Sequence, residues 1–581
     1  MLKIFCSTHR KLVLTSVLLL ILFFRLSTLE LLDLVDTTES RYAAVASEMF
    51  HSGNWTTPTI PSGTEYVPYL GKPPLHFWMM AQTYKFLGID EWTSRLPSFF
   101  SLILILGSFL LLARCLNDTK LALSASAILC SSLLIFALSG AALLDVTLTA
   151  FVSISIVSAF LFLESYGTVY LYCFWVSLGL GVLVKGPAAM LFTGLPLVAF
   201  SIHQHNFKRL FKLISPIGIV SFIVIVAPWF YLSEKANPGF LKYFFLNENV
   251  LRYVTKDYGD LYGQGHVHPY GTAILMFALG FLPWTTLAFG YVVSSKDRKG
   301  FGRLISSPLA SLAFFWMITP IIFLAFIRQL HFGYVIPAMP GAALWLAEIH
   351  SYSQKNKKHF SILNAILLFI MALCPFVAIG FGANLDAILY GVLALSICYF
   401  VYKLELGSIE RLATTASVLY ALVYLSWSPI VGALRSTNTV ISCIASSTAE
   451  EMPEVAIIGN RSFSANWLAG AWRGEIDQPF KLSFVPDRIT VPDSADFLLQ
   501  SRRDALLSLA NLEENSEIAN WRVYARVGTP HFDCSSAPWK GTNCCRYNWD
   551  PSQQSKIVKV LFETGKLLWG FVELKFSSHF N

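Results

Sequence analysis

The run LPSFFSLILILGSFLLLA, residues 96–113, holds eighteen consecutive residues without a charge. A helix of that length rises about 27 Å, close to the roughly 30 Å hydrocarbon core of a bilayer. Similar windows recur along the 581-residue chain, which is 55% hydrophobic and only 14% charged. Because soluble proteins carry about 25% charged residues, this composition excludes a soluble fold and predicts a mainly α-helical, polytopic membrane protein.

Apolar runs of this kind predict about thirteen transmembrane helices. They start near Leu12, Pro97, Leu121, Val146, Val169, Met190, Leu213, Thr272, Pro308, Val335, Ile362, Leu385 and Ala413. No small-residue cleavage site follows the first run, so we interpret it as an uncleaved span. Two long segments, 30–95 and 232–270, interrupt the spans, and the chain is polar after residue 436. We expect a transmembrane domain over 1–435 and a small soluble domain over 436–581.

Lys and Arg gather in every second loop, which indicates orientation. If the N-terminus is cytoplasmic, the cytoplasmic loops hold Arg114, Lys120, Lys208, Arg209, Lys212, Lys296, Arg298, Lys299, Arg303, Lys355, Lys357, Lys358, Lys403 and Arg411. This positive-inside pattern places the two long loops and the C-terminal domain on the outer, periplasmic face of a bacterial inner membrane. It also accounts for the net charge of +7 without a nucleic-acid partner.

The first long loop has helical character. Ser40–Phe50 has apolar residues at helical spacing, and Pro73–Leu87 is rich in aromatic residues. Aromatic rings favour the headgroup zone of a bilayer. Both stretches are therefore predicted to be helices that lie along the outer membrane interface.

The C-terminal region alternates strand-like and helical runs. A helical run covers 502–512, and 556–574 is a candidate amphipathic helix. The strand-like runs are Val455–Gly459, Lys481–Val485, Asp496–Gln500 and Trp521–Val527. Together these runs predict a small α/β fold.

Four cysteines fall in the predicted outer domain: Cys443, Cys534, Cys544 and Cys545. An oxidising compartment favours disulfides among them, and adjacent Cys544 and Cys545 are poorly placed to bond each other. A zinc site is the competing interpretation, but no paired spacing supports it. We therefore expect at least one disulfide and no metal centre.

Charged groups next to a membrane are costly and tend to be functional. Ionisable residues predicted on the outer side are Asp36, Glu39, Arg41, Glu65, Lys72, His76, Asp145, Lys185, Glu248, Arg252, His266, His268, Arg328 and His331. For any one of them, a salt bridge or a solvated charge is the simpler interpretation. As a set they supply cations to hold an anionic lipid phosphate and carboxylates to activate an acceptor.

The cations match a lipid phosphate. Lys72 stands before an interfacial helix in a segment stiffened by prolines, and Lys185 ends a span. Arg252 offers a planar fork that can hold two phosphate oxygens. Tyr69 and Tyr334 can each donate a hydroxyl.

Three carboxylates are candidates for a general base, which a sugar hydroxyl acceptor needs and an ionised phosphate acceptor does not. Asp36 and Glu39 lie at the mouth of the first span, and Asp145 opens the fourth. Helix capping competes with catalysis for Asp36 and Glu39. From these residues alone all three carboxylates stay candidates for the base.

Four motifs in order give the chain a family resemblance. They are Asp36-Thr-Thr-Glu39-Ser-Arg41-Tyr42, Ser52-Gly53-Asn-Trp55, Gly71-Lys72-Pro73-Pro74-Leu75-His76-Phe-Trp78 and Ser94-Arg95-Leu96-Pro97-Ser98. Asp145, Lys185-Gly-Pro, Arg252-Tyr253, Gly259–Gly263, His268-Pro269 and Tyr334–Pro337 continue the pattern. Over residues 12–345 the chain resembles the aminoarabinose-transferase and protein-mannosyltransferase-like family of C-type membrane glycosyltransferases, which take a sugar from a polyprenyl phosphate on the outer side of the membrane.

The resemblance implies roles for particular residues. In aminoarabinose transferases the lipid phosphate is held at the positions of Tyr69, Lys72, Lys185, Arg252 and Tyr334. Further site candidates are Arg41, Tyr42, His76, Glu248, His268, Arg328 and His331. The chain departs from the family pattern at Thr38, where an Asp is usual, at Gly71 and Asn249, and in the stretch before Tyr334. These departures leave the phosphate-binding positions intact and bear on the acceptor and the base. Because the family pattern points to the carboxylates before Arg41, we favour Asp36 or Glu39 over Asp145 as the base.

The leading hypothesis is transfer of a single sugar from a polyprenyl-phosphate donor to a lipid, glycan or protein acceptor. Lipid A or another lipopolysaccharide component is the first choice of acceptor. We expect membrane lipids as surroundings, no cofactor and a monomer. A flippase for lipid-linked sugars is the alternative, which predicts charges near mid-membrane and a two-repeat architecture. A structural envelope subunit is a third possibility, and it needs no such set of charges.

Overall fold

The computed structural model describes most of the transmembrane region and the strands that follow it. The described residues are 2–35, 38–62, 65–255, 261–262, 267–294, 302, 304–352, 358–379, 386–403, 408–435, 454–458, 481–485, 497–501, 512–518, 521–526, 538–539 and 542–543.

Helices dominate the described part of the chain. The α-helices are α1 Leu2–Ser27, α2 Thr38–Ser52, α3 Leu75–Leu87, α4 Glu91–Leu116, α5 Thr119–Cys130, α6 Leu133–Leu138, α7 Leu144–Leu163, α8 Val169–Lys185, α9 Pro187–His203, α10 Pro216–Ala236, α11 Phe240–Lys242, α12 Arg252–Val254, α13 Thr272–Gly280, α14 Trp284–Ser294, α16 Pro308–Ala325, α17 Met339–Tyr352, α18 Lys358–Ile379, α19 Asp386–Lys403 and α20 Ser408–Arg435. The 3-10 helices are η1 Phe207–Leu213 and η3 Phe332–Ala338, and η2 Tyr243–Leu251 is a π-helix. The strands are β1 Thr59–Ser62, β2 Glu65–Pro68, β3 Glu454–Ile458, β4 Lys481–Val485, β5 Phe497–Ser501, β6 Leu512–Ile518, β7 Trp521–Arg526, β8 Pro538–Trp539 and β9 Thr542–Asn543.

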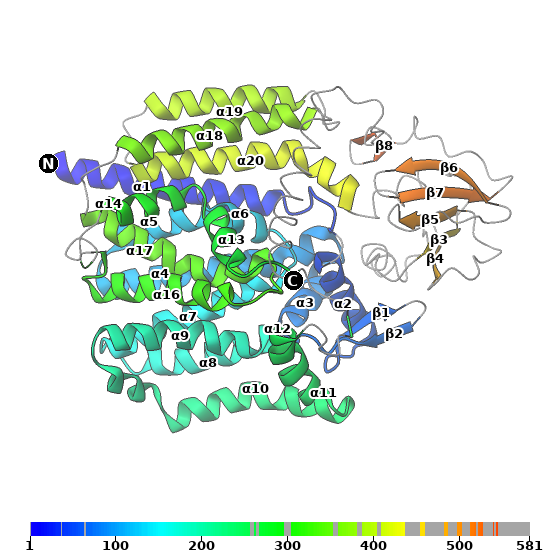
Figure 1. Cartoon of the computed structure of the whole chain (residues 1–581), viewed down its shortest axis with the longest axis horizontal. Helices are drawn as coiled ribbons and strands as arrows, with labels where there is room; N and C mark the ends of the chain where they lie inside the picture. Colours follow the sequence, from blue (N-terminus) through cyan, green and yellow to red (C-terminus); the bar gives the residue numbers. More distant parts are fainter. Residues whose placement is uncertain are drawn as a thin grey trace.

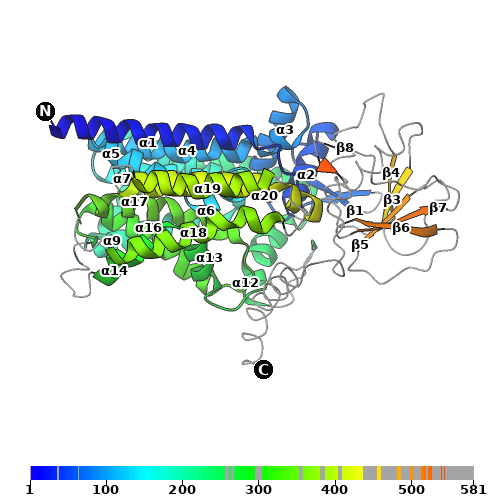
Figure 2. The same cartoon turned by 90° about the horizontal axis from the view of Figure 1, so that it is seen from above.

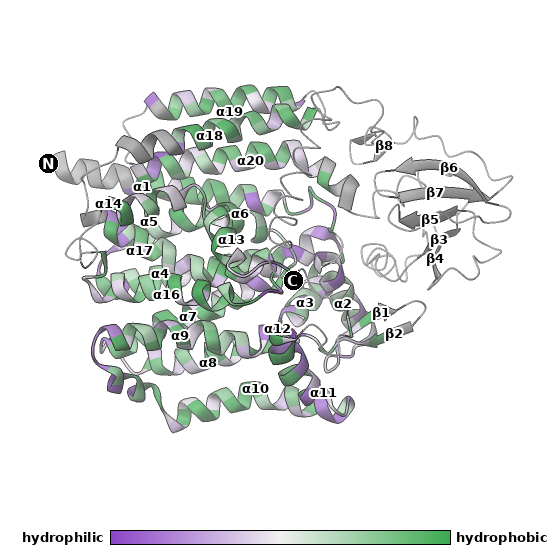
Figure 3. Cartoon of the chain, viewed as in Figure 1, coloured by the Kyte–Doolittle hydropathy of each residue, from purple (hydrophilic) through white to green (hydrophobic). Residues whose placement is uncertain are grey.

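The long helices lie side by side in one bundle (Figure 1), and most of their residues are hydrophobic (Figure 3). The start of α1 lies at one end of the bundle. At the other end both views show α2, α3, the β1–β2 hairpin and α12 together, with strands β3 to β7 beyond them (Figures 1 and 2). This gathering fits the prediction that the first long loop and the C-terminal region share one face of the membrane.

The predicted spans fall on helices, and the mainly helical fold with several apolar helices confirms a polytopic membrane protein. The count of thirteen spans stays a prediction. Among the described residues, five helices are long and apolar enough to cross a membrane alone: α4, α7, α10, α16, and η3 together with α17. A sixth span is the pair α13 and α14, which is bent by 112° at its break. The sequence did not predict this break, where Pro283 stands between the two helices. Helices α5, α8 and α9 are shorter, with 12, 17 and 17 residues.

The first outer loop contains both predicted helices, α2 and α3. It also contains an antiparallel hairpin, β1–β2, that the sequence did not predict. The indole of Trp78 donates to the Trp55 carbonyl and that of Trp229 in α10 donates to the Thr56 carbonyl, each at 2.8 Å. The first bond joins two parts of the loop and the second fixes the loop to α10, so the loop forms part of the folded body.

The C-terminal strands form a mixed five-stranded sheet in the order β4-β3-β5-β7-β6. Strands β3 and β4 pair in parallel, as do β3 and β5, whereas β7 is antiparallel to β5 and to β6. The four predicted strand runs are confirmed to within one residue at each end. The sequence missed β6 because its residues, LEENSEI, are mostly polar.

Several C-terminal predictions lie outside the described residues. They concern most of the helical run 502–512, the amphipathic stretch 556–574, and Cys443, Cys534, Cys544 and Cys545. The α/β class of this region and its disulfides therefore stay predictions.

Candidate active site

Two cations from different parts of the chain meet on one buried carboxylate. The Lys72 ammonium, just before α3, lies 2.6 Å from Glu248 Oε1, and the Arg252 guanidinium donates to the same oxygen. Arg252 Nε also donates to Gln329 Oε1 at 3.0 Å. Burial alone raises the pKa of Glu248, but Lys72 and Arg252 outweigh it and hold that pKa below its usual range. The three groups therefore stay charged together.

A second ion pair joins two spans at the same end of the bundle. Asp145 lies in the first turn of α7, where the helix dipole favours a carboxylate, and its Oδ1 is 2.5 Å from the ammonium of Lys185 at the end of α8. That ammonium also lies 3.9 Å from the centre of the Tyr334 ring. Lys72 and Arg252 act electrostatically on the Tyr334 hydroxyl as well. Tyr334 in η3 therefore links the two ion pairs into one site.

Two glycines allow these elements to approach each other. Gly186 follows Lys185 with φ of +64°, and a Cβ there would lie 2.5 Å from the Phe244 ring of η2. A Cβ on Gly333 in η3 would collide with the Asp145 carboxylate. The close approach of Phe244 to Gly186 sets η2, which carries Glu248, against the end of α8, and Arg252 follows as the first residue of α12. π-Helical turns such as η2 are common at functional sites. The Lys185-Gly-Pro motif therefore serves packing as well as charge.

Aromatic residues fix the segment that carries Lys72. Tyr69 is only 3% exposed and packs edge-on against Tyr262, with ring centres 4.8 Å apart. The Tyr262 hydroxyl accepts from the Leu70 N–H at 2.7 Å and donates to the Pro68 carbonyl at 2.8 Å. The Arg41 guanidinium lies 5.6 Å from the centre of the Tyr69 ring. Tyr262 was not among the predicted site residues, although it lies in the Gly259–Gly263 motif.

Among the described residues of the site, the charges do not cancel. Arg41, Lys72, Lys185 and Arg252 carry four positive charges, while Asp145 and Glu248 carry two negative ones. Arg252 acts electrostatically on Arg41, on Lys72 and on Tyr334, so these groups form one cluster. The excess of two positive charges favours an anion with up to two negative charges, such as a phosphate.

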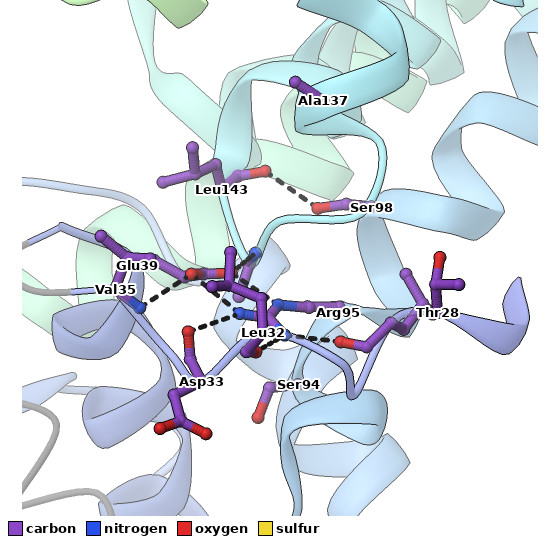
Figure 4. Close-up of polar contacts among 12 residues, drawn as sticks. Thr28, Leu32, Asp33, Val35, Glu39, Ser94, Arg95, Ser98, Ala137 and Leu143 are labelled. Carbon is purple, nitrogen blue, oxygen red and sulfur yellow. Dashed lines mark hydrogen bonds and ion pairs between the residues drawn. The ribbon is translucent and has the colours of Figure 1, made fainter. Parts of the chain in front are cut away.

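Glu39 forms a separate ion pair, shown in Figure 4. Its Oε1 accepts from Arg95 Nε at 2.8 Å and from the Ala142 N–H at 2.9 Å. Its Oε2 accepts from Arg95 Nη2 at 3.1 Å and from the Val35 N–H at 3.0 Å. Arg95 is 1% exposed and also donates to the carbonyls of Leu29, Leu32 and Asp33. Both carboxylate oxygens are thus engaged in joining the outer loop to α4 and to the start of α7.

We expect Glu39→Gln to destabilise the protein by about 3–5 kcal/mol, because it leaves the buried Arg95 guanidinium without its counter-charge. Arg95 and the two backbone donors hold the pKa of Glu39 below its usual range, although burial alone raises it. The pair therefore stabilises the fold at neutral pH and loses that effect only as pH falls through the depressed pKa. Thermal unfolding in detergent from pH 7 to pH 3 measures both effects. Glu48→Gln, in the same helix, is the control; equal melting temperatures for both variants would contradict this role.

The remaining candidates differ in what they contact. Asp36 lies outside the described residues. Tyr42 is buried beside Phe77, and His331 acts electrostatically on Asp145. His268 pairs its N–H with the Arg328 carbonyl at 2.7 Å, and the exposed Arg328 side chain lies over Tyr270. Among the described residues, no group of three or more His, Cys, Asp and Glu side chains could hold a metal ion.

Several known proteins with a similar sequence are named as sugar transferases. Residues 71–232, which include Lys72, Asp145 and Lys185, match the family described as dolichyl-phosphate-mannose-protein mannosyltransferase. The family resemblance is confirmed. The chain is 28% identical over 341 residues to an undecaprenyl phosphate-α-4-amino-4-deoxy-L-arabinose arabinosyl transferase of Proteus mirabilis, covering 57% of this chain and 58% of the relative. The corresponding Shewanella sediminis protein is 28% identical over 371 residues, covering 61% and 63%.

Solved structures show the same fold. The crystal structure of ArnT from Cupriavidus metallidurans bound to undecaprenyl phosphate superimposes with a TM-score of 0.66. It is 21% identical in sequence and covers 89% of this chain and 98% of its own. The fold likeness thus extends beyond the sequence match, which spans less than two thirds of the Proteus and Shewanella relatives.

Proposed function

We propose that this protein is a glycosyltransferase of the bacterial inner membrane that moves one sugar from a polyprenyl phosphate to an acceptor on the outer face. The observation that carries the proposal is the buried cluster of Lys72, Lys185 and Arg252 around Tyr334, which has excess positive charge. The printed names of the similar proteins, which specify undecaprenyl phosphate and aminoarabinose, support it.

In this proposal the cluster binds the donor phosphate and stabilises it as it leaves. A sugar joined to a lipid through a phosphodiester carries one negative charge, and breaking the sugar–oxygen bond leaves a lipid phosphate with up to two. Lys72 and Arg252 already lie close together on Glu248, so they are preorganised for the developing charge. Lys185 and the hydroxyls of Tyr69 and Tyr334 complete the phosphate site.

For an acceptor hydroxyl, we propose Asp145 as the general base, in place of the preference for Asp36 or Glu39. Glu39 uses both oxygens in the ion pair with Arg95, whereas Asp145 lies among the cations that would hold the donor. The acceptor oxygen would attack the anomeric carbon, its proton would pass to Asp145, and the phosphate oxygen would keep the bonding electrons. Lipid A is the first acceptor to test and a protein the second.

The proposed topology has thirteen spans, with residues 1–435 as the membrane domain and 436–581 as a periplasmic α/β domain. We expect an alkaline phosphatase fusion at Asn581 to be active and a cytoplasmic reporter fusion there to be silent. The opposite pattern in cells would contradict both the odd number of spans and the outer location of the site. A fusion at residue 120, in a predicted cytoplasmic loop, is the internal control.

Transfer by the purified protein tests the function itself. The protein in detergent or nanodiscs is incubated with lipid A and with undecaprenyl phosphate carrying aminoarabinose or mannose. Release of undecaprenyl phosphate together with a lipid A product heavier by one sugar supports the proposal. No release from either donor, with lipid A or with periplasmic protein as acceptor, would contradict it.

A further inference from the structure

His76 in α3 is completely buried beside the first turn of α7. Its Nδ1 lies 3.0 Å from the hydroxyl of Thr147, which in turn lies 2.9 Å from the hydroxyl of Ser101 in α4. The imidazole is therefore held by the hydroxyl of Thr147 in α7, which the hydroxyl of Ser101 in α4 supports in turn. Such support fixes the ring orientation, as a binding group requires.

The other ring nitrogen has no such support. Among the described residues, His76 Nε2 is buried and has no hydrogen-bond partner. Leaving a buried polar group unpaired costs about 1–3 kcal/mol, so natural proteins rarely keep one without a reason. The Glu39–Arg95 pair, by contrast, is fully bonded on both carboxylate oxygens.

The surroundings of His76 indicate what its free nitrogen would meet. Asp145 lies two residues before Thr147 on α7 and acts electrostatically on the imidazole. Lys72, the proposed phosphate ligand, comes four residues before His76 in the chain. The imidazole thus lies near the group proposed as base, on the chain segment that also carries the proposed phosphate ligand.

The chemistry of the ring selects a hydroxyl over a phosphate. Burial lowers the pKa of His76 to about 4, against a smaller effect of Asp145 in the opposite direction, so the imidazole is neutral at physiological pH. Depending on the tautomer, Nε2 is then a donor or an acceptor. A sugar hydroxyl can satisfy either tautomer, whereas a phosphate oxygen only accepts and gains more from a cation.

We propose that His76 is a sugar-binding residue of this site: its Nε2 hydrogen-bonds a hydroxyl of the donor's sugar and holds the anomeric carbon within reach of the acceptor beside Asp145. This inference rests on the proposed function and adds to it. In this proposal His76 recognises the sugar and the cations bind the lipid phosphate. The hydroxyls of Thr147 in α7 and Ser101 in α4 hold the imidazole in place.

Two substitutions separate the two ring nitrogens. His76→Asn places an amide near Nδ1, keeps a partner for Thr147 and lacks the reach of Nε2. His76→Gln extends an amide toward the Nε2 position. We expect the Asn variant to bind undecaprenyl phosphate within about twofold of wild type, while its KM for the sugar-bearing donor rises about tenfold. We expect the KM of the Gln variant to return most of the way to the wild-type value.

The measurements use purified full-length protein with undecaprenyl phosphate and its aminoarabinose and mannose conjugates, and melting temperatures check folding. If wild type binds none of these lipids, the proposed function fails and this inference fails with it. Suppose that wild type binds and uses a sugar-bearing lipid. If the Asn substitution then weakens the binding of undecaprenyl phosphate and of its sugar conjugate equally, or weakens neither, His76 does not recognise the sugar. Unchanged KM and kcat in a Thr147→Val variant would likewise contradict the role given to the hydrogen bond between Thr147 and His76.

Discussion

Replacing Asp145 by Asn is expected to lower turnover at least about a hundredfold while donor binding stays near wild type. Removal of a general base costs roughly 10²- to 10⁴-fold, and Asn keeps the size of the side chain and a bond to Lys185. Donor binding is expected to persist because Lys72, Arg252 and Tyr334 remain in place. Single-turnover kinetics with saturating donor, together with equilibrium binding of undecaprenyl phosphate, separate the two effects.

The controls are the other two carboxylates considered for this role. Glu39→Gln is expected to lower stability, with turnover per folded molecule close to wild type, and Asp36→Asn is expected to keep its turnover. A hundredfold loss in either one, with Asp145→Asn active, would move the base to the first outer loop. Near-normal turnover in all three would exclude a carboxylate base and favour an acceptor phosphate, which is already ionised.

Replacing Lys72 or Arg252 by Ala is expected to lower kcat/KM by about thirtyfold each, equivalent to about 2 kcal/mol for a lost charge-assisted bond. Both side chains are largely buried, with 11% and 15% exposure, so water screens them little. Because each also neutralises Glu248, removing one leaves that carboxylate with a single cation and less attraction for phosphate. Binding of undecaprenyl phosphate is expected to weaken in parallel with kcat/KM.

Lys85→Ala provides the matched control. Lys85 lies near the end of α3 and is exposed, and its ammonium lies near the Phe86 ring. The account predicts unchanged donor affinity for this variant. Equal losses in Lys72→Ala and Lys85→Ala would indicate a diffuse electrostatic effect of the surface, and full activity in Lys72→Ala and Arg252→Ala would contradict the phosphate site.

Much of the architecture follows from local sequence patterns. Uncharged runs locate the helices because the bilayer demands long apolar segments. Apolar residues at helical spacing locate α2, and an aromatic-rich stretch that opens with proline locates α3. Strand β6 and the break between α13 and α14 were missed. The polar residues of β6 are held in place by pairing with β7, so this strand has a weak local signal. The break had a local signal in Pro283, a residue that interrupts helices, which the prediction of a single span passed over.

The composition of the site was easier to predict than its pairings. Lys72, Lys185 and Arg252 were proposed as one group from their charge and from the family motifs, and the structure does bring them together around Tyr334. The partner of Glu39 was not predicted because Arg95 lies 56 residues away in sequence. The contact of Arg252 with Gln329, 77 residues apart, escaped prediction for the same reason.

The most direct test of sugar transfer is mass spectrometry of lipid A, surface glycans and periplasmic proteins from a deletion strain. The deletion strain is compared with four derivatives that express, at matched protein level, the wild-type protein, Asp145→Asn, the double variant Lys72→Ala with Arg252→Ala, or Lys85→Ala. We expect one species lighter by a single sugar in the deletion strain, in Asp145→Asn and in the double variant. We expect the wild-type and Lys85→Ala proteins to restore the heavier species. Identical glycan masses in all five strains would contradict it.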